Sequence, residues 1–316
     1  MKLKQLTFTL ILICCAAVGF TFSQKKPSKE KNGRSEQKTI EVKANLMVLD
    51  AENKFVDDVK AEEVKIFEDG IEQKITYFAK RPETLNLGII FDNSGSMRFA
   101  LNEIIQLGKS IVSNLQENDE AFAARFVDSD KIEMIEEWTS NQTKLRAALE
   151  EMYIEGGQSA IIDAIYLAGE KLSEREKKDK SKKYALVVIS DGEDRDSFYK
   201  YDEMLSLFKN TDIQIFMISY AFQAPLKPKA AAKFGGKITF DTGGRLINLT
   251  KKRNTEDINA ALKTLITELR SNYIFGYIST NQKSDGNARN LRVEIADGKN
   301  GRKRNVIVRQ TIIPVE

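Results

Sequence analysis

Apolar and polar residues alternate with a period of two near both ends of the chain. The alternation covers residues 39–80 and returns at Tyr273–Ile278, Leu291–Ile295 and Val306–Ile313. This period is typical of antiparallel strands that bury one face. Neither flank alone has enough strands to bury a two-sided core, so we expect residues 39–80 and 272–313 to pack together as one β-sandwich-like domain.

Two apolar runs in the first flank bracket a short turn sequence. Val64–Phe67 precedes Glu68-Asp69-Gly70, and Ile75–Phe78 follows it. Asp-Gly is a strong signal for a two-residue hairpin turn. We therefore predict that these two runs pair as a hairpin, and we prefer this interpretation to a calcium site at Asp69.

Strand and helix patterns alternate through the middle of the chain. This alternation predicts an α/β domain over residues 84–270, with a doubly wound, mostly parallel sheet. Strands are expected at Leu85–Phe91, Ala121–Val127, Ile132–Trp138, Tyr184–Ser190, Ile213–Tyr220 and Leu246–Leu249. Helices are expected at Leu101–Leu115, Lys144–Met152, Ala160–Leu172, Tyr201–Lys209 and Thr255–Leu269. The segment Phe222–Gly236 is rich in Ala and Lys, is interrupted by proline, and is left unassigned.

The chain begins with the pattern of a secretory leader. Two lysines precede the apolar run Leu6–Phe22, and small residues stand just before Gln24. We expect residues 1–23 to be a signal peptide cleaved before Gln24, so that the protein is exported to the periplasm, the cell surface or the medium. The alternative is an uncleaved membrane anchor, because the run approaches the length that spans a bilayer. Residues 24–38 contain almost no apolar side chain and should form a flexible linker.

The composition excludes several kinds of chemistry. The 316 residues include no histidine, so His-based triads and His-ligated zinc are not expected. Cys14 and Cys15 both lie in the leader, which leaves the mature chain without a disulfide or a thiol nucleophile. Ile13 stands where a lipoprotein signal has a small residue, which argues against lipidation. The formal net charge of +3 gives no case for nucleic acid binding.

Two of the apolar strands end abruptly in polar loops. Asp92-Asn93-Ser94-Gly95-Ser96 follows the first strand of the α/β domain, and Asp191-Gly192-Glu193-Asp194 follows the strand Tyr184–Ser190. The carboxyl ends of parallel strands meet at one edge of a sheet, where ligands collect. Glu155–Ser159 precedes a helix and is a third candidate loop, since backbone and hydroxyl groups there can approach a charge.

The first loop has the chemistry of a hard-cation site. Asp92, Ser94 and Ser96 alternate, so one carboxylate and two hydroxyls can turn toward one point, and Gly95 lets the backbone bend between them. Oxygen ligands of this kind suit a divalent cation such as Mg²⁺. The alternative for this loop alone is a serine-rich turn without a ligand.

The three loops together resemble the von Willebrand factor A (VWA) domain and its metal-ion-dependent adhesion site. FDNSGSM matches the D-x-S-x-S motif of the family, GGQSAIIDAI its Gly-Gly-Thr loop and the following helix, and VVISDGEDR its strand-terminating Asp-Gly. The second loop departs from the pattern, because Ser159 replaces the threonine and Gln158 is inserted after the glycines. The resemblance implies that one Mg²⁺ or Mn²⁺ binds to five residues: Asp92, Ser94, Ser96, Ser159 and Asp191.

The flanks resemble a bacterial VWFA-related family that surrounds the domain with β-rich segments. The similar stretches are VLDAENKFVDDVKAEEVKIFEDGIEQKITYF before the domain, and TGGRLINL and ELRSNYIFGYISTNQKSDGNARNLRVEI after the metal loops. This resemblance covers the chain from about residue 40 to the end and implies an exported bacterial protein.

The resemblance implies a protein-binding module rather than an enzyme. In VWA domains an acidic residue of a partner protein completes the coordination of the metal. One alternative is a Mg²⁺-dependent hydrolase with Asp92 as nucleophile or base. The other is a structural exported domain with a vestigial metal site. A membrane partner is expected only if the leader stays uncleaved, and the basic stretch Lys299–Arg304 is interpreted as a charged turn.

Overall fold

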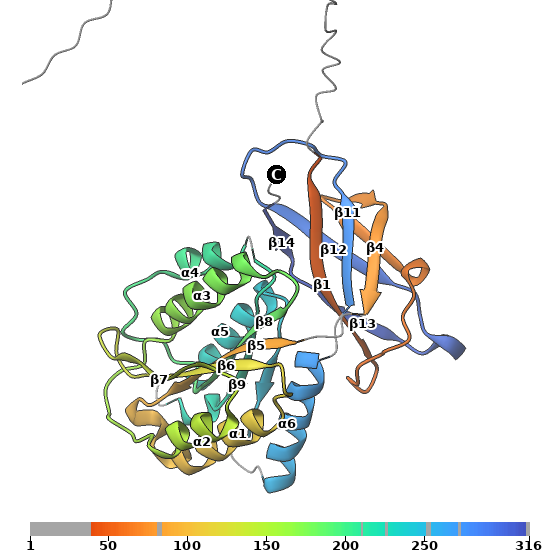
Figure 1. Cartoon of the computed structure of the whole chain (residues 1–316). Coiled ribbons are helices and arrows are strands. Elements are labelled where there is room, and N and C mark those ends of the chain that lie inside the picture. Colours follow the sequence, from red (N-terminus) through yellow and green to blue (C-terminus); the bar gives the residue numbers. More distant parts are fainter. Residues whose placement is uncertain are drawn as a thin grey trace, which may run out of the picture. The chain divides into compact units, whose positions relative to one another are not determined.

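The apolar run that ends at Asp92 forms an interior strand of a mostly parallel sheet in the computed structural model (Figure 1). The structure describes residues 39–80, 84–209, 211–224, 227–250, 254–270 and 273–313. The predicted signal peptide and linker lie outside these residues. No helix within the described ranges is both long and apolar enough to cross a bilayer.

The sheet has six strands in the described residues, in the order β10-β9-β8-β5-β6-β7. Neighbouring strands are parallel, apart from the antiparallel pair β6 and β7. The strands are β5 (Leu85–Asp92), β6 (Glu120–Phe126), β7 (Ile132–Thr139), β8 (Lys183–Ser190), β9 (Gln214–Ser219) and β10 (Leu246–Asn248). Strands β5 and β8 are buried along their whole length, as expected for a parallel sheet that is covered on both faces.

Helices cover both faces of this sheet (Figure 1). They are α1 (Leu101–Ser113), α2 (Gln142–Glu150), α3 (Ile161–Lys178), α4 (Tyr201–Phe208), α5 (Pro228–Asp241) and α6 (Thr255–Arg270). One core cluster joins α1, α2 and α6 to the sheet through residues such as Leu107 and Leu265. The other joins α3, α4 and α5 through residues such as Ile165 and Phe208. The sheet is therefore a layer between two helical layers.

Local sequence explains where several helices begin. The side chain of Asn141 accepts hydrogen bonds from the amides of Thr143 and Lys144, which satisfies two donors at the start of α2. Pro228 occupies the first turn of α5, where its missing amide hydrogen costs nothing. A short 3₁₀ helix, η2 (Gly95–Ala100), leads from the first polar loop into α1. The loop therefore passes directly into a helix packed on the sheet.

Strands from both flanks combine in two further sheets. These are β13-β1-β11-β4 and β14-β12-β2-β3, and their paired strands are antiparallel. The strands are β1 (Glu41–Asp50), β2 (Val64–Glu68), β3 (Ile71–Gln73), β4 (Ile75–Lys80), β11 (Tyr273–Ile278), β12 (Arg289–Ile295), β13 (Arg304–Ile307) and β14 (Thr311–Ile312). One core cluster contains Val42, Ile66 and Leu291, so residues of both sheets share it. The predicted fold class, a doubly wound α/β sheet with a β-sandwich-like domain built from the flanks, is confirmed.

Strand β1 is buried on both faces over its second half. Leu46 and Val48 lie in the core shared by the antiparallel sheets. Met47 and Leu49 belong to the core cluster on one face of the six-stranded sheet. The second half of β1 is therefore an unbroken apolar run. A strand that is buried on one face only would have an exposed polar residue at every second position.

The predicted hairpin has a different second strand. Val64–Glu68 does turn back at Asp69-Gly70, but it pairs with Ile71–Gln73. Ile75–Lys80 pairs with β11 in the other sheet. The prediction that Ile75–Phe78 pairs with Val64–Phe67 was therefore wrong, because the tight turn leaves only three residues for the returning strand before the chain changes sheets.

The segment that sequence patterns left unassigned is largely helical. It contains most of the 3₁₀ helix η3 (Ala221–Gln223) and most of α5. Lys and Gly residues obscure the helical pattern of this segment in the sequence. Ala231, Gly235 and Ile238 are nevertheless buried on one face of the helix.

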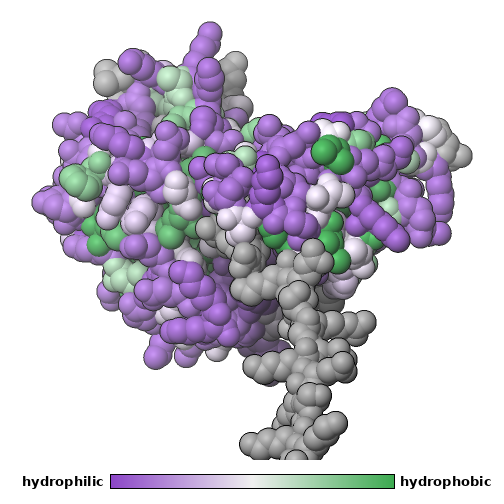
Figure 2. All heavy atoms as spheres, turned by 90° about the horizontal axis from the view of Figure 1, so that it is seen from above, coloured by the Kyte–Doolittle hydropathy of each residue, from purple (hydrophilic) through white to green (hydrophobic). Residues whose placement is uncertain are grey.

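On the face shown in Figure 2, hydrophobic residues occur in small separate groups among hydrophilic ones.

Candidate functional site

The candidate site lies where β5 and β8 end side by side. These parallel neighbours pair up to Phe91 and Ile189, so the residues that follow reach the same edge of the sheet. The chain continues from β5 to β6 on one side and from β8 to β9 on the other. This edge is therefore the switch point of the sheet, where doubly wound folds bind ligands. Asp92 and Asp191 are both fully buried there.

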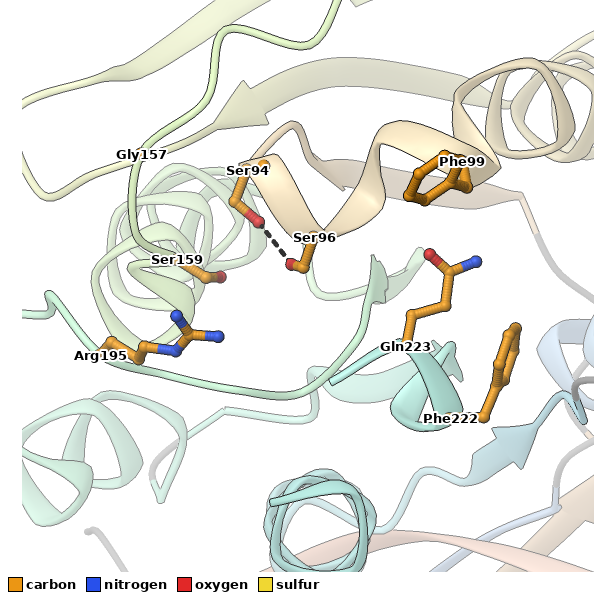
Figure 3. A pocket seen from close by; sticks show the side chains of 9 residues that line it. Ser94, Ser96, Phe99, Gly157, Ser159, Arg195, Phe222 and Gln223 are labelled. Atoms are coloured by element: carbon orange, nitrogen blue, oxygen red, sulfur yellow. Dashed lines mark hydrogen bonds between the residues drawn. The ribbon is translucent and has the colours of Figure 1, made fainter. Parts of the chain in front are cut away.

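Asp92 gathers groups from three segments. Its Oδ1 accepts a hydrogen bond from the Ser94 amide at 2.9 Å. Its Oδ2 accepts one from the Ser159 hydroxyl at 2.9 Å and one from the Ser190 hydroxyl at 2.6 Å. Ser94 Oγ and Ser96 Oγ lie 3.1 Å apart, and Figure 3 shows them on the same side of a pocket as Ser159. The structure thus brings the predicted residues of the first two loops together.

Asp191, the fifth predicted residue, has one carboxylate oxygen without a protein donor. Its Oδ1 accepts the Glu193 amide at 2.9 Å, whereas Oδ2 is buried and has no hydrogen-bond partner among the described residues. Burial raises the pKa of Asp191. The Glu193 amide opposes that rise, and so does the nearby Ser96 hydroxyl, although it makes no hydrogen bond to Oδ2. A buried carboxylate oxygen of this kind is costly unless a cation compensates it.

The two carboxylates also act on each other. Burial, and then the negative charge of Asp191, raise the pKa of Asp92 to about 6, while hydrogen bonds from Ser190 and Ser94 oppose the rise. Two neighbouring carboxylates in one buried site repel each other when both are charged, which costs free energy. A divalent cation between them would remove this repulsion.

The second loop is held in place by hydrogen bonds to Asp128 and to the backbone of the third loop. Gly157 has a φ of +85°, and a Cβ there would lie 2.5 Å from Asp128 Oδ1, so only glycine fits. The inserted Gln158 donates its amide to the same carboxylate. The carbonyl of Ser159 accepts the amides of Arg195 and Asp196 at 2.8 and 3.2 Å. The Gln158 insertion is thus accommodated, and the Ser159 hydroxyl still reaches Asp92.

Sequence reasoning missed Ser190 and Glu193. Ser190 is fully buried, donates to Asp92 and accepts the Gly192 amide at 3.0 Å. The signal for it was a hydroxyl at the end of an otherwise apolar strand. The Glu193 carboxylate binds the Arg195 guanidinium and accepts the Lys227 amide, so it ties the third loop to the segment before α5. No sequence pattern indicated the contact with Lys227, because that residue lies 34 positions further along the chain.

The donor set suits a hard divalent cation. The Ser159 hydroxyl contacts the buried Asp92 carboxylate, and the Ser94 and Ser96 hydroxyls contact each other. Asp191 adds a buried carboxylate oxygen from the neighbouring strand end. Among the described residues, no group of three or more His, Cys, Asp or Glu side chains could hold a metal, so a metal at this edge would depend on hydroxyl ligands. Mg²⁺ accepts such mixed oxygen ligands and keeps waters in its remaining positions.

Comparison with known proteins gives one family. The family model described as von Willebrand factor type A domain matches residues 86–261, which is more than half of the 316 residues. No curated protein matches the chain.

Parts of this chain are similar to solved structures at low identity. An aerotolerance-related membrane protein from Bacteroides fragilis, with multiple mutations to serines, is 19% identical, and the match covers 58% of this chain and 98% of that one (TM-score 0.44). The conserved hypothetical protein BatB from Bacteroides thetaiotaomicron is 18% identical with the same coverage (TM-score 0.45). Proximal thread matrix protein 1 from the mussel byssus is 13% identical, and the match covers 60% of this chain and 49% of that one (TM-score 0.45).

Proposed function

The chain belongs to the von Willebrand factor type A domain family, and on this premise we propose that it is an exported protein that binds an acidic residue of a partner protein through a bound Mg²⁺ or Mn²⁺. It acts by binding rather than by catalysis. The proposal concerns the edge of the sheet formed by Asp92, Ser94, Ser96, Ser159 and Asp191.

One observation supports this function above the others. Asp191 Oδ2 is buried without a partner among the described residues, next to a second buried carboxylate whose pKa is raised to about 6. A purely structural carboxylate pair would have both members satisfied by protein donors. Here both oxygens of Asp92 accept hydrogen bonds, whereas only one oxygen of Asp191 does. This is expected of a pair that shares a cation.

The residues of the site have distinct roles in this proposal. The hydroxyls of Ser94, Ser96 and Ser159 and the free oxygen of Asp191 would hold the metal. Asp92 orients the Ser159 hydroxyl and, through its Oδ1, the Ser94 backbone, and it contributes directly or through water. With few protein charges on it, the bound metal would supply an electrophilic position that takes a carboxylate from the partner.

Export is supported by the order of charged, apolar and small residues before Gln24. The expected mature protein starts at Gln24 and is found outside the cytoplasm. Mass spectrometry of the protein from fractionated cells tests this. An intact Met1 start on protein in the membrane fraction would establish the anchor instead.

Metal binding is tested by thermal melts of the protein with Mg²⁺, with Mn²⁺ and with EDTA. A ligand that binds only the native state adds RT ln(1 + [L]/Kd), about 2.7 kcal/mol at a hundredfold excess over Kd. We expect a metal-dependent rise in melting temperature of the wild type. The same melting temperature in metal and in EDTA would contradict the proposal.

The variant Asp92→Asn separates a metal site from a structural carboxylate pair. Asparagine keeps an acceptor for the Ser94 amide and removes the repulsion from Asp191. We therefore expect the metal-free variant to be as stable as the wild type or more stable, and to have lost the rise with Mg²⁺. Asp196→Asn is the control, because Asp196 lies at the same edge but binds Ser129. An equal Mg²⁺ response in Asp92→Asn would remove the metal from this site.

A partner is sought by capture from envelope extract on immobilised wild type and Asp92→Asn, each with Mg²⁺ and with EDTA. The expected partner is retained by the wild type in Mg²⁺ and is released by EDTA. Retention that is equal in all four conditions would show binding that does not use the metal.

A further inference from the structure

A cavity opens directly above the hydroxyls of the candidate site. It has a volume of about 680 Å³, and its lining includes Ser94, Ser96, Phe99, Ser159, Arg195 and Phe222. Pockets for ligands usually measure about 300–1,000 Å³. A single carboxylate fills only a small part of such a volume, so the cavity has room for neighbouring residues of the same partner.

The two sides of the cavity differ in chemistry. Figure 3 shows Arg195 close to Ser159 on one side, and Phe99, Phe222 and Gln223 on the other side of the serines. Arg195 is the charged residue among the lining residues that the structure describes. An acidic segment of a partner would therefore not be repelled by a carboxylate in the lining. The residues next to its acidic side chain would contact aromatic rings.

Phe99 offers an uncovered aromatic surface. It lies in η2, only three residues after Ser96, and is 92% exposed. A side chain of this size removes apolar area from water when a partner covers it, and exposed aromatics at a pocket are typical of binding anchors. The position next to the metal ligands means that whatever binds the metal passes close to this ring.

Phe222 is a second aromatic residue on the same side of the pocket (Figure 3). Its ring packs against Tyr220 with centroids 6.0 Å apart, and the Tyr220 hydroxyl donates to Glu103 of α1. On the other side, the Arg195 guanidinium is held by Glu193. Both side chains are thus positioned before a partner arrives, which lowers the entropy cost of binding.

We propose that this pocket recognises an extended segment of a partner protein in which an acidic residue stands next to a bulky apolar residue. The inference rests on the proposed function, since the acidic residue goes to the metal. The apolar residue packs on Phe99 and Phe222 and supplies selectivity among acidic segments.

Blocked synthetic hexapeptides test this selectivity. Gly-Gly-Asp-Phe-Gly-Gly and Gly-Gly-Phe-Asp-Gly-Gly carry both features, Gly-Gly-Asp-Ala-Gly-Gly lacks the apolar side chain, and Gly-Gly-Asn-Phe-Gly-Gly lacks the acid. Each is added to millimolar concentration to the ¹⁵N-labelled protein, and shifts of amide signals give the affinity. In Mg²⁺ we expect the better of the two Asp and Phe peptides to bind about tenfold more tightly than the Asp-Ala peptide. We expect no binding of the Asn peptide or of any peptide in EDTA.

The variant Phe99→Ala assigns the preference to this ring. Because Phe99 is exposed, its removal should leave the fold, the Mg²⁺ response and the affinity for the Asp-Ala peptide unchanged, while the preference for phenylalanine falls severalfold. Phe198→Ala is the matched control, since Phe198 is 79% exposed and does not line the pocket. Equal affinities for the Asp-Phe and Asp-Ala peptides would overturn the inference, as would an equal loss of preference in Phe198→Ala.

The two proposals fail differently. If Mg²⁺ raises the melting temperature but the peptides show no metal-dependent preference for phenylalanine, the metal site stands and this inference is wrong. If Mg²⁺ changes neither stability nor peptide binding, the proposed function itself is wrong.

Discussion

Buried charges in this protein are balanced in different ways. Asp92 is surrounded by hydroxyl and amide donors, whereas Glu268, which is 1% exposed near the end of α6, is paired with Arg245. The ammonium group of Lys183 lies in the same region and donates to the carbonyl of Leu269 at 2.8 Å. Burial nevertheless raises the pKa of Glu268 to about 7, and Arg245 only partly opposes the rise. The ion pair therefore does not fully compensate for desolvation.

Glu268→Gln should change how stability depends on pH. A glutamate in the unfolded chain has a pKa of about 4.3, below the folded value, so between these values the folded state binds more protons. The unfolding free energy of the wild type should therefore fall as pH rises from about 4.3 to about 7, and this contribution is constant above that range. The variant lacks this fall, so relative to the wild type it should gain about 1–3 kcal/mol between pH 5 and pH 8.

Urea unfolding of both proteins at pH 5 and pH 8 measures this difference. Glu174→Gln is the control, because Glu174 is exposed on α3 and should show the same pH dependence as the wild type. A constant difference between Glu268→Gln and the wild type at both pH values would show that Glu268 does not titrate in this range.

At the scale of elements, the tight turn between β2 and β3 decides which sheet each strand joins. Asp69 and Gly70 have φ values of 48° and 83°, the left-handed pair that a two-residue hairpin needs. This turn closes β2 on three residues, and the chain then enters β4 in the other sheet. A change at the turn therefore acts on the pairing of both sheets.

Gly70→Ala should destabilise the protein by about 1 kcal/mol, through the cost of a left-handed conformation for alanine. No atom lies within 4 Å of the added Cβ, so steric contact plays no part. Gly236→Ala is the matched control. It lies within α5, where the added Cβ would be 3.7 Å from Leu246, and alanine favours the helix. Thermal melts should move in opposite directions, and equal shifts would contradict this account of the turn.

Much of the central sheet and its polar edge could be predicted from the sequence, because fully buried strands are continuous apolar runs and the acids stop them. The partner of β2 could not be predicted, since Ile75–Phe78 alternates equally well in either sheet. Ser190 and Glu193 escaped notice because one partner of each, Asp92 and Lys227, lies on a distant segment of the chain. The exposure of Phe99 was equally hidden, because an aromatic residue before a helix usually signals a buried contact.

At the scale of the molecule, Arg309 connects the segment between β13 and β14 to helix α4. It is 7% exposed, and its guanidinium lies 3.4 Å from the carbonyls of Phe208 and Lys209 at the end of α4. Burial lowers the pKa of Arg309, while the carboxylates of Asp212 and Glu176 oppose that shift. A cation at the carboxyl end of a helix is favoured by the helix dipole.

Arg309→Met should lower the unfolding free energy by about 2 kcal/mol, because the buried carbonyls and Glu176 lose their cation. Arg292→Met is the control, since the Arg292 side chain is half exposed and pairs with Glu294 on the surface. Denaturant unfolding should show a lower midpoint for Arg309→Met and little change for Arg292→Met. Equal midpoints for the two variants would mean that the Arg309 contact is not stabilising.

Because β1 pairs with β11, the sheet that contains both strands can form only late in the life of a new chain. Leu46 lies opposite Tyr273, with the whole α/β segment between them in the chain. The strand β1 emerges long before β11, both during synthesis and during export across a membrane. Its edges therefore stay unpaired while the α/β segment can already collapse. Closing so long a loop is slow, which makes the sandwich the last part to form. A newly made chain is thus exposed to aggregation and proteolysis until its final strands have emerged and paired.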